Sequence, residues 1–387
     1  MRIGLVLERF DPTRGGLENW SWQFARSLVA RGHEVHVVAF DFYPGTDNDG
    51  IIAHQLEMPK SRIDRAALIA GELPALNFDI VHDMGIGWAA DVIQPHAGST
   101  KALWEHNLMR IPKWRQIRFW RERRYRELEE IERRQHANAK AIISPVSHML
   151  ARNFEFFDRL PASRMRVIHN GVDVEKFTPA NRDKYRDQTR KQLGVGSEVI
   201  FLSLAHNLLL KNAEATIRAI GALTNEDAPV RLIIAGGKKP DRFIKLAEKL
   251  KITHLVTFLD LVDPMPYYAA ADVFVHPTWY DPCSLVTLEA SSCGLPVITS
   301  RFNGAAELMT DGKEGFIVAD PADVTALAGR MRQLLDPALR EKMGAAGRAM
   351  AIQNPFENQT SRFLELYREV AAKKERSSNG GQEATAI

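Results

Sequence analysis

The 387-residue chain lacks the features of a secreted or membrane-spanning protein. Its two cysteines, Cys283 and Cys293, lie ten residues apart around a predicted helix, which indicates reduced packing residues rather than a disulfide. No apolar run approaches the roughly 18 residues that a transmembrane helix needs. Charged side chains interrupt residues 1–8 too early for a signal peptide. We therefore expect a cytoplasmic protein.

An excess of charge of one sign is also missing. The chain has 51 Lys and Arg residues and 48 Asp and Glu residues, a formal net charge of +3. This balance gives no overall attraction to nucleic acid, so an electrostatic partner must be attracted by a local patch. With 45% hydrophobic residues, the chain is long enough to bury the cores of two domains.

Short apolar runs alternate with helical patterns along the whole chain, which predicts parallel sheets with helices on both faces. Two sets of about six strands indicate an α/β protein with two Rossmann-like, doubly wound domains that face each other across a cleft. The predicted strands are residues 2–7, 35–40, 79–82, 92–94, 140–144 and 165–168, then 198–205, 230–235, 255–259, 272–276, 296–299 and 315–318.

We expect an N-terminal domain over residues 1–175 and a C-terminal domain over 190–355, with a linker from about Asn170 to Arg190. A helix over residues 356–373 carries apolar side chains on one side, namely Phe363, Leu366, Tyr367 and Val370. The polar residues 376–387 should form a disordered tail.

The most informative segment runs from His276 to Thr299. An apolar strand leads into a loop that carries Asp281, a helix follows, and a second acid, Glu289, comes eight residues after the first. Eight residues are a little over two helical turns, so the two acids lie on related faces. The helix N-terminus offers free N–H groups and a positive dipole end to an anion. Two acids that can accept hydrogen bonds from hydroxyl groups, together with a helix N-terminus that can bind phosphate, suit a sugar nucleotide.

This segment resembles the acid-x7-acid signature of retaining glycosyltransferases of family 4, which have the GT-B fold. The family usually has Glu at the first acid, where this chain has Asp281. The resemblance covers nearly the whole chain and includes the hinge-proximal string from Val167 to Pro179. It implies that Glu289 binds ribose hydroxyls and that Asp281 binds the transferred sugar. It also implies that the diphosphate meets the amides of Ser284, Leu285 and Val286, and that the last helix packs on the N-terminal domain.

Other landmarks of the family have partial matches. Lys211 matches a lysine that neutralises the leaving diphosphate, whereas the family's upstream arginine is missing and His206 and Asn207 stand near its place. Gly15 and Gly16, at the start of the first helix, match glycines close to the donor and acceptor. His96 resembles a histidine that lines the sugar pocket, and His82 is a weaker candidate. Catalysis is thus expected from Asp281, Lys211 and His96.

Two further patterns are set aside. Asp47-Asn-Asp49 imitates a metal-binding motif but lies in a polar loop with no second ligand cluster, so we expect no metal and no other cofactor. The glycines of residues 85–90 imitate a dinucleotide fingerprint without the acid that should follow.

Residues 101–126 combine basic and aromatic side chains. They hold nine Lys and Arg and two Glu, a local charge of +7, which is typical of an interfacial surface, although a solvated helix with a packed aromatic side would show it too. Single-stranded nucleic acid would also fit this pattern, but no other feature supports it. The residues assigned to a membrane or acceptor surface are Trp114, Arg118, Trp120, Arg121, Arg123 and Arg124.

The sequence therefore predicts an enzyme that transfers a sugar from a UDP-, GDP- or ADP-sugar to a glycan or lipid-linked acceptor, in cell-envelope polysaccharide or lipopolysaccharide synthesis. The basic segment places it on the inner face of the cytoplasmic membrane as a peripheral protein. The alternatives are a sugar-nucleotide epimerase of the same fold and a non-catalytic sugar-binding relative. A glycan phosphorylase would need a pyridoxal lysine and a far longer chain.

Overall fold

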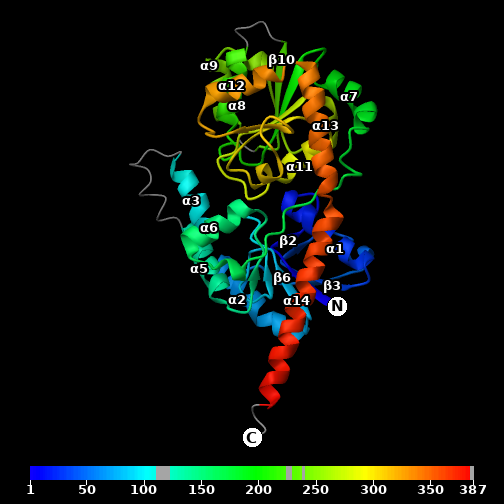
Figure 1. Cartoon of the computed structure of the whole chain (residues 1–387), viewed down its shortest axis with the longest axis vertical. Helices are drawn as coiled ribbons and strands as arrows, with labels where there is room; N and C mark the ends of the chain where they lie inside the picture. Colours follow the sequence, from blue (N-terminus) through cyan, green and yellow to red (C-terminus); the bar gives the residue numbers. More distant parts are fainter. Residues whose placement is uncertain (110–122, 224–228, 238–239, 384–387) are drawn as a thin grey trace. The chain divides into compact units, whose positions relative to one another are not determined.

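The computed structural model describes the chain except for residues 110–122, 224–228, 238–239 and 384–387 (Figure 1). It divides into two compact units. The first unit comprises Met1–His169 together with Glu357–Ile387, and the second comprises Asn170–Phe356. Among the described residues, no helix is both long and apolar enough to cross a membrane.

The first unit contains a six-stranded parallel sheet in the order β5-β3-β1-β6-β7-β8. The strand order reverses after β1, so the sheet is doubly wound and has a switch point between β1 and β6. The strands are β1 (Arg2–Val6), β3 (Glu34–Ala39), β5 (Ile51–Gln55), β6 (Ile80–Asp83), β7 (Val92–Ile93) and β8 (Ile142–Ile143), beside a small separate pair of β2 (Arg9–Phe10) and β4 (Asp41–Phe42).

Helices cover this sheet because its central strands are apolar on both faces. Trp20 of α1 donates a hydrogen bond from Nε1 to Gln359 of α14 over 2.9 Å, so the first and last helices pack together. The helices are α1 (Gly16–Ala30), α2 (Arg62–Glu72), α3 (Thr100–Met109), α5 (Arg123–Ala137), α6 (His148–Asp158) and, from the end of the chain, α14 (Phe356–Glu383).

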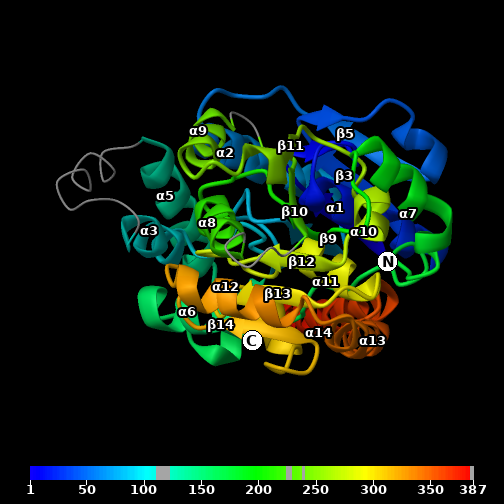
Figure 2. The same cartoon turned by 90° about the horizontal axis from the view of Figure 1, so that it is seen from above.

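The second unit repeats the same design, with a parallel sheet in the order β11-β10-β9-β12-β13-β14. Helices α8, α9 and α12 lie on one face, and α7, α10, α11 and α13 lie on the other (Figures 1 and 2). The strands are β9 (Val199–Leu204), β10 (Val230–Ala235), β11 (Val256–Leu259), β12 (Val273–His276), β13 (Val297–Ser300) and β14 (Gly315–Val318). The helices are α7 (Asn181–Gln192), α8 (Ala213–Leu223), α9 (Asp241–Lys249), α10 (Pro264–Ala270), α11 (Leu285–Ser292), α12 (Val324–Gln333) and α13 (Pro337–Gln353).

All six strands predicted for the second unit are present, but one strand of the first unit is wrong. Residues 165–168 form only an isolated bridge, between Met165 and Ile143. The sixth strand is β5, which pairs with β3 at the edge of the sheet. An edge strand does not need a continuous apolar pattern, and the apolar run of β5 ends after Ile51, Ile52 and Ala53, so the sequence gives only a short signal there.

The C-terminal helix packs on the first unit, as the resemblance implied. Phe363 and Tyr367 are fully buried, and the Tyr367 hydroxyl lies 2.5 Å from Nδ1 of His82. The expected disordered tail over residues 376–387 is wrong up to Glu383, because α14 continues to that residue. A helix that is already nucleated adds one hydrogen bond per residue, so it continues beyond its packed part.

The expected linker is also wrong in its second half. Residues 181–190 belong to α7, a polar helix that packs on α10 of the second unit. Arg186 and Arg190 donate hydrogen bonds to the carboxylate of Asp272 over 2.7 and 3.2 Å. The same carboxylate accepts a bond from the backbone N–H of Ile200 over 2.9 Å, so Asp272 fastens α7 to the sheet. Because arginine side chains rather than an apolar face hold α7 in place, the sequence lacks the apolar pattern that would have predicted this helix.

Asp272→Asn should therefore destabilise the second unit by about 3 kcal/mol, because it removes the partner of two largely buried cations. Burial alone would raise the pKa of Asp272, but the Ile200 N–H and the two guanidinium groups lower it below its usual value. The stabilisation is thus present above the unfolded pKa and is lost as pH falls through the lower folded pKa. We expect the difference in thermal stability between wild type and variant to shrink below about pH 4.

The matched control is Asp183→Asn, which removes an exposed acid from the same helix and should change stability by less than about 0.5 kcal/mol. Equal melting temperatures for Asp272→Asn and Asp183→Asn at pH 7 would contradict this account of α7.

Candidate functional site

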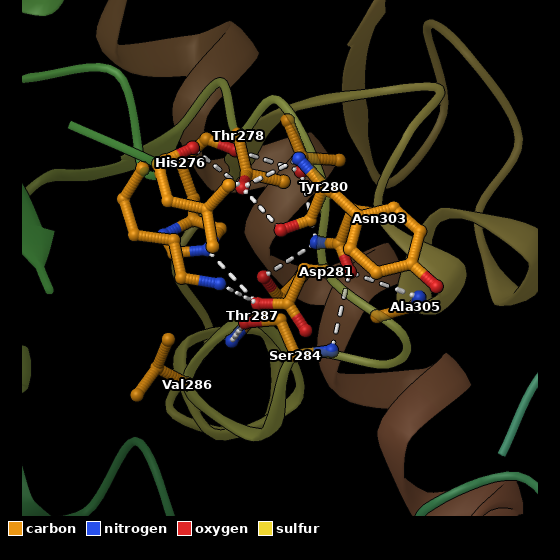
Figure 3. A network of polar contacts seen from close by, with 12 residues as sticks. His276, Thr278, Tyr280, Asp281, Ser284, Val286, Thr287, Asn303 and Ala305 are labelled. Atoms are coloured by element: carbon orange, nitrogen blue, oxygen red, sulfur yellow. Dashed lines mark hydrogen bonds and ion pairs between the residues drawn. The ribbon is translucent and has the colours of Figure 1, made fainter. Parts of the chain in front are cut away.

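Three loops meet at the carboxyl edge of the second sheet. They follow β9, β12 and β13, and they carry Lys211, Asp281 and Asn303 (Figure 3). The switch point of this sheet lies between β9 and β12, where ligands bind in open α/β sheets. The structure therefore brings together Lys211 and Asp281, which were both predicted for the donor site.

An ion pair lies at the centre of the site. The Nζ of Lys211 lies 2.5 Å from Oδ2 of Asp281, and Nε2 of the buried His276 lies 3.3 Å from the same oxygen. Burial would raise the pKa of Asp281, but Lys211 and His276 outweigh it and hold this pKa well below its usual range. Asp281 is therefore an anion at any physiological pH.

The position of this carboxylate refines the role expected for Asp281. One of its oxygens, Oδ2, is occupied by both Lys211 and His276, which leaves Oδ1 for a ligand. Asp281 and Lys211 were predicted as separate contacts to the sugar and to the diphosphate. In this structure they are partners, so a ligand anion that reaches Lys211 competes with Asp281.

The N-terminus of α11 is arranged for anion binding, with one correction. Ser284 caps the helix through its side chain, but its backbone N–H donates to Oδ1 of Asn303 over 3.1 Å. The Ser284 amide is therefore engaged within the protein and does not serve as the expected phosphate donor. Leu285 and Val286 are the first two helical residues, and N–H groups at these positions have no intrahelical acceptor. They remain suited to a phosphate.

Asn303 is a site residue that the sequence analysis did not assign. Its Oδ1 accepts from the amides of Ser284 and Ala305, each over 3.1 Å. Its Nδ2 donates to the hydroxyls of Thr287 and Thr299, over 3.0 and 2.9 Å (Figure 3). A buried amide that joins two loops leaves no local pattern in the sequence.

Glu289 lies deeper on α11 and is held by a second unassigned residue. The hydroxyl of Tyr268, in α10, donates to Oε2 of Glu289 over 2.8 Å. Burial raises the pKa of Glu289 to about 7, against the opposing effects of the Tyr268 hydrogen bond and the charge of Lys176. A carboxyl group with this pKa exchanges its proton near neutral pH.

The residues in place of the missing arginine do not reproduce its charge. His206 and Asn207 are both exposed, and Oδ1 of Asn207 accepts from the Leu210 amide over 3.1 Å. The backbone N–H of Lys211 donates to the carbonyl of Asn207 over 2.9 Å. Asn207 thus shapes the turn that presents Lys211.

In the first unit, the predicted glycines and His96 belong to one neighbourhood. Gly15 is the N-cap of α1 and Gly16 is its first residue. The ring of Trp20, one turn later, lies 4.7 Å from the ring of His96. Burial lowers the pKa of His96 to about 3, so its ring is neutral. His82 is fully buried against α14, where it has a packing role rather than a binding role.

The glycines that imitate a dinucleotide fingerprint have a structural explanation. The backbone N–H groups of Gly85, Ile86 and Gly87 donate to the buried carboxylate of Asp83 over 2.7, 2.7 and 2.9 Å. A Cβ at Gly87 would lie 2.6 Å from Oδ2 of Asp83, so this close turn requires glycine. Within the described part of the chain, no cluster of three or more His, Cys, Asp or Glu side chains is arranged to hold a metal ion. Metal independence stays a prediction.

The predicted membrane surface is only partly covered by the structure. Trp114, Arg118, Trp120 and Arg121 lie outside the described residues. Arg123 and Arg124 begin α5 and are exposed, with Arg123 paired to Glu127 over 2.7 Å. Trp104, another aromatic residue of the segment, is 8% exposed and therefore packs inside the unit.

Comparison with known proteins gives one matching family model for each unit. A model described as Glycosyl transferases group 1 matches residues 185–350, and a model described as Glycosyltransferase Family 4 matches residues 14–176. The D-inositol 3-phosphate glycosyltransferase of Corynebacterium urealyticum is 32% identical over 244 residues, which cover 60% of this chain and 57% of that protein. The chain thus spans a little over half the length of the curated relatives that head the comparison.

Solved structures with the same fold cover almost the whole chain. WaaG, described as a glycosyltransferase involved in lipopolysaccharide biosynthesis, superposes with a TM-score of 0.79 at 21% identity, over 94% of this chain and 99% of its own. Anabaena HepE in complex with UDP-glucose superposes with a TM-score of 0.73 at 19% identity, over 95% of this chain and 100% of its own. At these identities the likeness establishes the fold.

Asn303→Ala should reveal how strongly the loops after β12 and β13 depend on one side chain. It leaves two amides and two hydroxyls without their partner, so we expect a loss of about 3 kcal/mol in the free energy of unfolding. Asn303→Asp keeps the acceptor, replaces the donor with an oxygen and buries a carboxylate, so its cost should fall as pH is lowered and the carboxyl group is protonated. Urea unfolding measures both. A loss below about 1 kcal/mol for Asn303→Ala would show that the loops hold each other without it.

Proposed function

The chain belongs to the family 4 glycosyltransferases and has the GT-B fold, and on this premise we propose that it transfers a sugar from a nucleoside diphosphate to a hydroxyl group. The observation that carries the proposal is the grouping of Lys211, Asp281 and the N-terminus of α11 at one edge of the second sheet. A cation, a carboxylate and free backbone amides in one place suit the diphosphate and hydroxyl groups of such a donor.

Each group has a distinct task in this scheme. The amides of Leu285 and Val286, with Lys211, stabilise the charge that grows on the departing diphosphate. Glu289 accepts hydrogen bonds from ribose hydroxyls. Asp281 aims Lys211 through Oδ2 and offers Oδ1 to a hydroxyl of the sugar. The geometry supports this division because the two oxygens of Asp281 have different surroundings.

Donor binding adds a second anion to the ion pair of Lys211 and Asp281. Before the donor binds, Lys211 neutralises Asp281, and neither charge is left without a partner at the buried site. When the diphosphate enters, Lys211 gains a second anion and the charge is shared. This arrangement keeps the lysine in place without the family's second cation, whose position is taken by His206 and Asn207.

Retention of the anomeric configuration is part of this proposal, because the acid-x7-acid spacing is that of the retaining enzymes. The donor is a UDP-, GDP- or ADP-sugar, and the HepE complex with UDP-glucose supports a nucleotide sugar. The proposed setting is the synthesis of cell-envelope polysaccharide or lipopolysaccharide. WaaG supports that setting as a glycosyltransferase involved in lipopolysaccharide biosynthesis. The GDP-mannose-dependent phosphatidylinositol monomannoside mannosyltransferase of Mycolicibacterium smegmatis, 31% identical over 219 residues, supports it too.

The test is nucleotide release from a panel of UDP-, GDP- and ADP-sugars, with the anomeric configuration of the product read by NMR. We expect one donor to be consumed, and Lys211→Ala to lower the rate by about 10²–10³ at saturating donor, the scale for one preorganised charge stabiliser. Lys249→Ala, an exposed lysine of α9, is the control and should keep wild-type activity.

Three results would count against the proposal. A changed sugar still attached to its nucleotide would indicate an epimerase. Binding without release from any donor would indicate a non-catalytic relative. A rate loss below about threefold for Lys211→Ala would move the charge stabilisation to another group.

We also propose that the acceptor is lipid-linked and that the protein docks reversibly on an anionic membrane through residues 101–126. The support is the local charge of +7 with interleaved aromatics, together with the exposure of Arg123 and Arg124. Each basic side chain near an anionic surface contributes on the order of 1 kcal/mol, so four or five are enough for weak docking. This attraction acts through solvent and is screened by salt.

We expect co-sedimentation with vesicles to rise with their anionic lipid content and to fall at high salt. Glutamine at Arg118, Arg121, Arg123 and Arg124 should remove the binding and leave donor hydrolysis unchanged. The matched control replaces four exposed lysines of the second unit, Lys191, Lys245, Lys249 and Lys342. Equal binding to neutral and anionic vesicles, or none to either, would favour a soluble acceptor.

A further inference from the structure

Tyr268 is the residue of the second unit whose position most needs an explanation. It lies in α10, it is fully buried, and its hydroxyl points at α11. The hydroxyl lies 2.8 Å from Oε2 of Glu289 and 3.2 Å from the backbone carbonyl of Val286. Neither the sequence pattern nor the family signature assigns it a role.

The ring of Tyr268 is held from two sides. Phe177, in the segment before α7, lies edge-on with its ring centroid 6.0 Å away. Phe274, in β12, lies at the same distance with an interplanar angle of 59°. Both phenylalanines are buried, so the tyrosine ring cannot turn without disturbing the core. A ring fixed in this way delivers its hydroxyl to one defined point.

That point lies between the two functional parts of α11. Val286 lies in the first turn of α11, and its amide is one of the two that we assign to phosphate. Glu289 follows three residues later on the same face of the helix. One hydroxyl therefore contacts both the phosphate end of the helix and the acid behind it. Tyr268 occupies Oε2 of Glu289. The other oxygen, Oε1, makes no hydrogen bond within the described part of the chain, so it is available to a ligand.

We propose that Tyr268 is a positioning residue for nucleoside recognition: it fixes the carboxyl group of Glu289 so that Oε1 faces the ribose hydroxyls of the donor. The proposal rests on the ribose role given to Glu289 in the proposed function. Without the tyrosine hydroxyl, the carboxyl group rotates freely about its last side-chain bond. Water then competes for the oxygen that should face the ribose. The tyrosine itself does not touch the donor.

The hydrogen bond has a second effect, on the proton of Glu289. The groups that influence this carboxyl are the Tyr268 hydroxyl from α10 and Lys176 from the segment before α7, which both favour its anion. At the end of α11, burial raises the pKa of Cys293 to about 12, so that thiol is uncharged. Arg348 of α13 and Arg182 of α7 face Cys293. Loss of the tyrosine hydroxyl thus raises the pKa of Glu289, so its anion needs a higher pH.

The experiment compares a nucleoside diphosphate with its 2′,3′-dideoxy analogue, by calorimetric titration of the full chain. The base is the one that the donor panel selects among UDP, GDP and ADP. Tyr268→Phe should weaken the ribonucleotide about tenfold, the scale for one hydrogen bond to a charged group, and the dideoxy analogue less than about twofold. Ribonucleotide affinity should fall as pH is lowered and Glu289 is protonated. The pH at which half of the affinity is lost should be higher in Tyr268→Phe than in wild type.

The matched control is Tyr267→Phe, which removes the same hydroxyl from the neighbouring residue of α10. The Tyr267 hydroxyl makes no hydrogen bond in the described part of the chain, so this variant should bind both nucleotides as wild type does. Melting temperatures of both variants report any general loss of fold.

Glu289→Ala separates this inference from the function on which it rests. If Glu289→Ala keeps the wild-type preference for the ribonucleotide, the ribose role of the acid is itself wrong. If Glu289→Ala loses that preference while Tyr268→Phe keeps it, only the role of Tyr268 is refuted. An equal loss of both nucleotides in Tyr268→Phe, with no shift in the pH profile, shows that the tyrosine merely stabilises the fold.

Discussion

The candidate site depends on the hydrogen bonds that join the loop after β12 to the loop after β13. The backbone of Asp281 pairs with the second loop on both sides, through Phe302 and Gly304. The side chain of Asn303 then reaches back to Ser284 at the start of α11. These contacts fix the position of the Asp281 carboxylate relative to the N-terminus of α11. Without them, the carboxylate and the anion-binding amides would belong to two independent loops.

Electrostatic balance explains why such a site is stable before a ligand binds. Asp281 and Lys211 are both largely buried, and the removal of either would leave a charge with too few partners. Their pairing keeps the carboxylate ionised and the lysine oriented. Among the described residues, Glu289 forms no ion pair and takes a neutral hydroxyl as its partner, so burial raises its pKa. Two acids on one short segment thus have opposite behaviour, and their neighbours account for the difference.

The first unit uses buried polar groups for a different purpose. His82 and Tyr367 form a contact in the interior that fastens the last helix to a sheet made from the beginning of the chain. Asp83, the next residue, holds the turn that follows β6 through three backbone amides. His96 packs on the first helix through Trp20. In this unit His82 and Asp83 therefore serve packing and turn geometry, and the cleft role of His96 stays a prediction.

The sequence by itself determined the two doubly wound sheets, because their central strands are apolar on both faces and leave a continuous signal. The eight-residue spacing of two acids around a helix start also located Asp281 and Glu289, and the resemblance to the family located Lys211. Only the tertiary structure decided which oxygen of Asp281 is occupied, that Asn303 joins two loops and that Tyr268 supports Glu289. Such contacts join residues far apart in the chain, and a hydrogen bond between distant side chains leaves no periodic trace in either segment.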